Sequence, residues 1–142
     1  MKIKITKAKI IKAIEMEAHL MPGSFAIQNE HGTCDVCAVG AVVRGSIRSK
    51  DSEVIGYVAS YAVDVPEADC HPSEYDDFRA AARDLATNRD YWSALSVFFE
   101  GTANEVRTMR ARKRRTIEFV KSHFPASVML DIGDAKPRGK AA

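Results

Sequence analysis

The sequence lacks a long hydrophobic run, a cysteine-rich framework and a strong net charge. Its longest apolar stretch, residues 36–43, is far shorter than the roughly 20 residues that a membrane span requires, so we expect no membrane partner. Lys2 and Lys4 alternate with isoleucines and no apolar segment follows them, which does not fit a secretory signal. Three cysteines are too few for a disulfide scaffold, which favours a reducing compartment and a cytoplasmic location.

The sequence also lacks the common phosphate-binding motifs. Neither Gly-x4-Gly-Lys-Ser/Thr nor Gly-x-Gly-x2-Gly occurs, and the acidic pair Asp76 and Asp77 stands where helix capping explains it. With 21 basic and 19 acidic residues, the formal net charge of +2 argues against indiscriminate binding to nucleic acid. These absences favour a non-enzymatic protein over an enzyme.

What is present is a helical pattern with little strand. Residues 35–48, with Thr33 or Asp35 as cap, are apolar around nearly the whole helical circumference, which predicts a buried central helix. Gly40 in this helix allows a neighbouring backbone to approach closely. The other expected helices are 6–20 capped by Thr6, 52–63 (where a strand is the alternative), one capped by Ser73, one from Asp90 to a stop at Gly101, and 103–124.

Two short strands complete the prediction. Residues 24–28 and 127–132 have strand character, the second through alternating apolar positions, and we expect them to pair. The predicted fold is helix-dominated α+β, with about five helices around the buried central helix and a small two-stranded sheet. We expect residues 1–132 to form a single globular domain and residues 133–142 to form a disordered tail.

The densest group of metal-ligand residue types surrounds the start of the predicted central helix. Cys34 and Cys37 form a Cys-x2-Cys pair with His31 just before them, and Cys70-His71 lies in a later loop. Such a set could close a structural zinc site, although adjacent side chains such as Cys70 and His71 rarely chelate one ion easily. The favoured interpretation is core and turn cysteines with no cofactor.

The same cysteines support a second hypothesis, nucleophilic catalysis. Both Cys34 and Cys37 lie near a predicted helix N-terminus, where the helix dipole lowers a thiol pKa. The acidic neighbour Asp35 opposes thiolate formation, and no local pattern fixes a histidine as general base.

Basic residues gather in one helix, and acidic residues gather in the segment 64–77, which contains no Lys or Arg. The basic set that we expect to contact a partner comprises Arg107, Arg110, Arg112, Lys113, Arg114 and Lys121. On a helical wheel Lys113 falls within the apolar face, so it must extend along the surface or mark an uncovered end. The two charged segments could pair within the fold, or the basic one could bind a partner. Aromatic residues for base stacking are missing from the basic run, which favours a protein over single-stranded nucleic acid.

The segment Cys34-Asp35-Val36-Cys37-Ala38-Val39-Gly40-Ala41-Val42 resembles small uncharacterised proteins of phages and prophages. Gly23-Ser24-Phe25 before it is also similar, as are parts of the later helices around Leu95 and Phe119. The resemblance implies no catalytic residues. It implies a product of a phage or mobile element that binds host machinery, such as an anti-CRISPR-type inhibitor of a defence complex.

The function predicted from the sequence is therefore stoichiometric binding to a host protein or nucleoprotein complex in the cytoplasm. The alternatives are a zinc-stabilised module or a cysteine-dependent hydrolase centred on Cys34 and Cys37, and a DNA-binding regulator that uses the basic helix.

Overall fold

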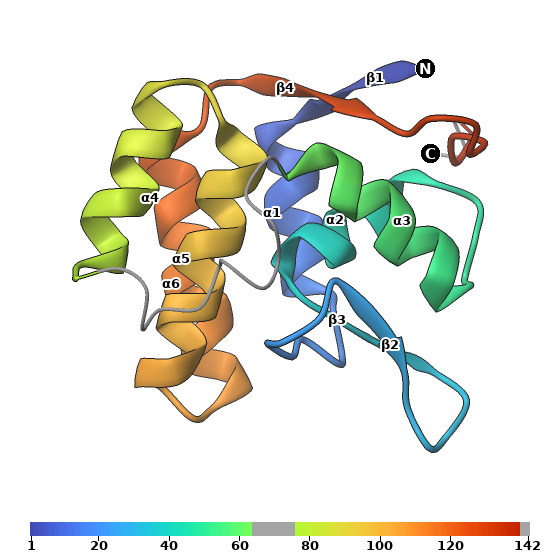
Figure 1. Cartoon of the computed structure of the whole chain (residues 1–142), viewed down its shortest axis with the longest axis horizontal. Coiled ribbons are helices and arrows are strands. Elements are labelled where there is room, and N and C mark those ends of the chain that lie inside the picture. Colours follow the sequence, from blue (N-terminus) through green and yellow to red (C-terminus); the bar gives the residue numbers. More distant parts are fainter. Residues whose placement is uncertain (64–75, 140–142) are drawn as a thin grey trace.

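The computed structural model describes residues 1–63 and 76–139. Helices dominate an α+β fold, as predicted, with two small antiparallel sheets (Figure 1). The helices are α1 (Lys7–Glu15), α2 (Ala38–Ser46), α3 (Ser52–Ala62), α4 (Phe78–Thr87), α5 (Tyr91–Glu105) and α6 (Met109–His123). The strands are β1 (Lys2–Thr6), β2 (Ala26–Gln28), β3 (Cys34–Val36) and β4 (Ser127–Asp131).

Helix α2 is the buried centre of the fold, as its composition predicted. Every residue from Ala38 to Val43 is buried, and the helix contacts α1, α3, α5 and β3. Burying each large apolar side chain contributes about 1.5–3 kcal/mol, so packing rather than helix propensity stabilises this valine-rich segment. In Figure 1, α4, α5 and α6 lie on one side of α1 and α2, and α3 lies on the other.

The helix begins later than predicted. Residues 34–36 form β3, and the cap is Cys37 rather than Thr33 or Asp35, because the Cys37 Sγ accepts a hydrogen bond of 3.4 Å from the Gly40 amide. A thiol is an unusual cap, and the sequence pattern does not reveal it.

The predicted strand pairing is wrong. Strand β4 pairs with β1, with Ile5 opposite Val128 and Ile3 opposite Leu130, whereas β2 pairs with β3 through a hairpin. The alternation of lysine and isoleucine in β1 places the isoleucines toward the core and the lysines in solvent, which is the period of a half-buried strand.

Several helix ends also differ from the prediction. Thr6 caps α1 as expected, but α1 ends at Glu15, and α6 begins at Met109 behind a Thr108 cap. Asp77 caps α4, and the predicted cap Ser73 lies outside the described residues. Helix α3 forms as favoured, with Asp51 as cap.

Gly101 does not end α5, which continues to Glu105. A Cβ at this position would lie 2.2 Å from the Phe78 ring of α4, so the glycine lets two helices pack closely. Glycine here serves helix packing rather than helix termination.

The segment after β4 lies beside the C-terminal end of α2. Pro137 lies opposite Ile47 in an isolated bridge, and the Arg138 amide donates to the Ser46 carbonyl at 2.8 Å. Residues 133–139, for which we expected disorder, are therefore held to the end of α2 by backbone hydrogen bonds. Residues 140–142 lie outside the described part.

The close approach at Gly40 gives the first testable prediction. A Cβ there would lie 1.9 Å from the Phe25 carbonyl oxygen, which is backbone and cannot rotate away. We expect Gly40→Ala to lower the free energy of unfolding by about 3 kcal/mol in urea denaturation. Gly45→Ala is the matched control on the same helix, because its Cβ would meet Ala13 at an ordinary 3.6 Å. It should raise stability by about 0.5 kcal/mol, and equal effects of the two substitutions would contradict the close approach.

Helix α6 gives a second prediction. The Thr116 hydroxyl is buried and has no hydrogen-bond partner among residues 1–63 and 76–139, whereas the Thr108 hydroxyl accepts the Ala111 amide at 3.2 Å as helix cap. We expect Thr116→Val to stabilise the protein by about 1 kcal/mol, because it removes an unsatisfied polar group without changing the side-chain shape. Thr108→Val should destabilise it by about 1 kcal/mol. The same Thr→Val substitution should thus change the free energy of unfolding in opposite directions at the cap of α6 and within the helix, as measured by thermal or urea unfolding.

Candidate functional site

The residues around Cys34 form a polar cluster that connects α1, β3 and α2. Arg44 of α2 forms an ion pair with Glu17, which follows α1 and is 8% exposed. The Arg44 guanidinium also donates to the Cys34 carbonyl at 2.8 Å, and the Glu17 carboxylate accepts the His19 amide at 3.1 Å. Because both charges are paired and hydrogen-bonded, the cluster is suited to holding these three elements together.

The turn between β2 and β3 is organised by Asn29. Its side-chain oxygen accepts the amides of His31 and Thr33, and its side-chain nitrogen donates to Asp35 at 3.1 Å. Gly32 adopts a positive φ of 77°, a conformation that favours glycine. His31 is therefore an exposed turn residue, 3.7 Å from Glu30.

The metal-ligand candidates are not assembled in the described structure. His31 is exposed, whereas Cys34 and Cys37 are buried in β3 and at the start of α2. Cys70 and His71 lie outside the described residues. Within residues 1–63 and 76–139, no three His, Cys, Asp or Glu side chains lie together in a way that could hold a metal ion.

The surroundings of Cys34 disfavour a nucleophile. Burial raises the pKa of its thiol, and the nearby Arg44 guanidinium only partly opposes this rise. A higher pKa leaves less thiolate at neutral pH, and the thiolate is the reactive form. Cys37 engages its sulfur in capping α2.

The basic residues of α6 separate into two groups. Three contact the rest of the fold: Arg112 donates to the Leu20 carbonyl at 3.3 Å, Lys113 to the Glu15 carbonyl at 3.0 Å, and Arg115 to Glu105 at 3.4 Å. Lys113, which the helical wheel placed in the apolar face, thus reaches the last carbonyls of α1, where a cation is favoured.

The second group comprises Arg110, Arg114 and Lys121 of α6, together with Arg107, which lies just before the helix; we call these four residues the basic face. All four are exposed, and among the described residues their charged groups make no ion pair or hydrogen bond. Arg110, Arg114 and Lys121 project within about 40° of each other around α6, at 100° per residue. Of the predicted partner-binding set, these four residues have no ionic partner within the described part of the chain, whereas Arg112 and Lys113 are engaged within the fold.

The backbone of α6 is held against α1. The Lys7 ammonium donates to the Lys121 carbonyl at 3.1 Å, and Lys113 makes the reciprocal contact to Glu15. Each lysine thus meets the C-terminal end of the other helix, which fixes an antiparallel pair. The basic face is therefore carried on a rigid element. The predicted acidic segment 64–77 lies mostly outside the described residues; its Asp77 caps α4.

Comparisons with protein families, with curated proteins and with solved structures found no match. In the part of the chain that the structure describes, no helix is long and apolar enough to cross a membrane.

The raised pKa of Cys34 gives a third prediction. The test uses a Cys70→Ser variant, in which Cys34 and Cys37 are the thiols. We expect a disulfide reagent such as DTNB at pH 7.5 to react with the native protein at least roughly tenfold more slowly than with the protein unfolded in guanidinium. One thiol equivalent that reacts as fast as in the unfolded chain would revive the nucleophile hypothesis.

Proposed function

We propose that this protein acts by stoichiometric binding to an acidic surface of a macromolecular partner, and that the basic face of α6 is its contact surface. The observation that carries this proposal is the exposure of Arg107, Arg110, Arg114 and Lys121 without ionic partners in the described structure. Cations that have no ionic partner among the described residues, three on α6 and one just before it, attract an oppositely charged surface and orient it during encounter.

A protein surface is favoured over nucleic acid as the partner. The chain is close to neutral as a whole, and no exposed aromatic residue lies within the basic run for stacking on bases. The resemblance to phage proteins supports a bacterial host macromolecule as the partner. The partner it suggests is a host defence complex, which this protein would inhibit.

The test is affinity capture from a bacterial lysate with the triple variant Arg107→Glu/Arg110→Glu/Arg114→Glu. We expect the wild-type protein to retain a protein partner at 50 mM salt and to lose most of it at 500 mM salt, because exposed charges are screened. The triple variant should lose the partner at both salt concentrations and keep its melting temperature within a few degrees.

A matched control carries the same change in charge elsewhere. Lys9, Lys50 and Arg83 are exposed and have no ionic partner within the described residues, so their triple replacement by glutamate should leave capture intact. The lysate is also treated with nuclease before capture. Loss of binding after nuclease treatment would assign the basic face to nucleic acid, and retention by the α6 triple variant would reject this face as the contact surface.

A further inference from the structure

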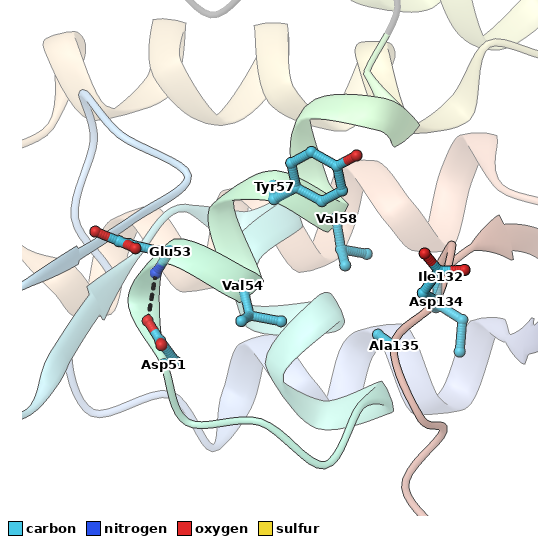
Figure 2. Close-up of a pocket in the computed structure, with 8 residues that line it drawn as sticks. All are labelled: Asp51, Glu53, Val54, Tyr57, Val58, Ile132, Asp134 and Ala135. Atoms are coloured by element: carbon cyan, nitrogen blue, oxygen red, sulfur yellow. Dashed lines mark hydrogen bonds between the residues drawn. The ribbon is translucent and has the colours of Figure 1, made fainter.

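A second surface of opposite charge lies on α3, across the molecule from α6 (Figure 1). Here a groove of about 470 Å³ runs between α3 and the segment that follows β4. Its volume falls in the range of ligand-binding pockets. Figure 2 shows α3 and the segment around Ile132 forming the two sides of this groove.

The floor of the groove is apolar. Val54 and Val58 contribute from α3, and Ile132 and Ala135 contribute from the segment after β4. In Figure 2 the two valines project from the side of α3 that faces Ile132 and Ala135. Aliphatic side chains at the base of an open groove favour a ligand with an apolar portion.

The rim of the groove is acidic. Asp51, Glu53 and Asp134 belong to its lining and are exposed, and none of its described lining residues is basic. Lys50 and Lys136, the sequence neighbours of this rim, are not among the lining residues. The groove therefore combines an apolar floor with a negative edge, which is complementary to a cation on an aliphatic stem.

Two exposed tyrosines lie on α3: Tyr57, which lines the groove, and Tyr61, one helical turn further along. Tyr57 is 60% and Tyr61 is 66% exposed, their ring centroids are 4.8 Å apart, and the Tyr57 hydroxyl donates to the Tyr61 hydroxyl at 3.0 Å. This hydrogen bond raises the pKa of Tyr57, with a smaller contribution from Asp134. Tyrosines that present a fixed aromatic face to solvent are typical of contact surfaces, and such a face attracts cations.

We propose that this groove binds a lysine- or arginine-bearing segment of a partner protein. The aliphatic stem of the basic residue packs on Val54, Val58 and Ile132, and its charged end lies between the Asp134 carboxylate and the Tyr57 ring. A second basic residue of the segment meets Glu53. The groove is separate from the basic face of α6, so the segment it takes has the opposite charge to the partner proposed above.

The test uses the full chain labelled with ¹⁵N and three probes. They are the peptides Ac-Gly-Leu-Lys-Arg-Leu-Gly-NH2 and Ac-Gly-Leu-Gln-Gln-Leu-Gly-NH2, and spermidine. We expect the basic peptide to shift amide resonances of residues 51–61 and 132–135, and the glutamine peptide to bind at least about tenfold more weakly. Comparable shifts with spermidine would reduce the groove to an unspecific acidic patch and overturn the proposal.

Variants separate the roles of charge and ring. Asp134→Asn should lower the affinity for the basic peptide about three- to fivefold, because it removes one exposed charge pair. Tyr57→Leu should lower the affinity for this peptide about two- to fivefold, whereas Tyr57→Phe should leave the affinity unchanged, because the peptide contacts the aromatic face of the ring. Asp84→Asn on α4 is the matched control, since it removes an exposed carboxylate outside the groove lining and should leave affinity unchanged.

The remaining outcomes decide against the groove. The proposal is overturned if the amide resonance shifts spread over other acidic positions, or if the two peptides bind equally well. It is also overturned if sedimentation shows a concentration-dependent dimer that Asp134→Asn abolishes. The triple variant of the basic face should bind the peptide as the wild-type protein does. Failure of the groove is therefore distinguishable from failure of the proposed function, since the two assays use different variants.

Discussion

The rest of the structure depends on the contact between the Phe25 backbone and Gly40. The Phe25 carbonyl accepts the Cys37 amide at 3.3 Å and occupies the space that a Cβ at position 40 would need. This contact fixes the β2–β3 hairpin on the first turn of α2. Because α2 packs against α1, α3 and α5, its position determines where the remaining elements lie. Packed interiors leave little room for such a contact to shift, so a single methyl group here is felt throughout the fold.

Both charged surfaces are positioned from this centre, on opposite sides. Helix α3 packs directly on α2, whereas α6 is attached through α5 and through α1, where Lys7 and Lys113 make reciprocal contacts with helix ends. The separation has an electrostatic consequence, since charges more than about 8–10 Å apart across solvent are largely screened at physiological salt. The near-zero net charge therefore conceals a polar molecule, in which the basic face and the acidic groove act as distinct local fields.

The parts of the fold that follow from local periodicity could be predicted, and those that depend on distant partners could not. The all-round apolar pattern of 36–43 identified the central helix, and its small residues indicated the close backbone approach that Gly40 makes. The strand character of 127–132 was evident, but its partner was not, because strand pairing between chain ends leaves no local pattern. Gly101 was misinterpreted for the same reason: the Phe78 ring that requires it comes from another helix.

The candidate surfaces show the same division. Sequence analysis could select the basic residues of α6 and separate Lys113, on the apolar face of the helical wheel, from the others. It could not show that Lys113 reaches the end of α1, because that contact depends on the position of another helix. The groove gave no motif at all, because its two sides, around residues 51–58 and 132–135, are far apart in the sequence, and Asp51 already serves as the cap of α3. A partner that covers α6 leaves α3 accessible, since the two helices lie on opposite sides of α1 and α2 in Figure 1. It follows that the two proposed surfaces would be occupied independently, and that the protein could hold a basic and an acidic macromolecular surface at the same time.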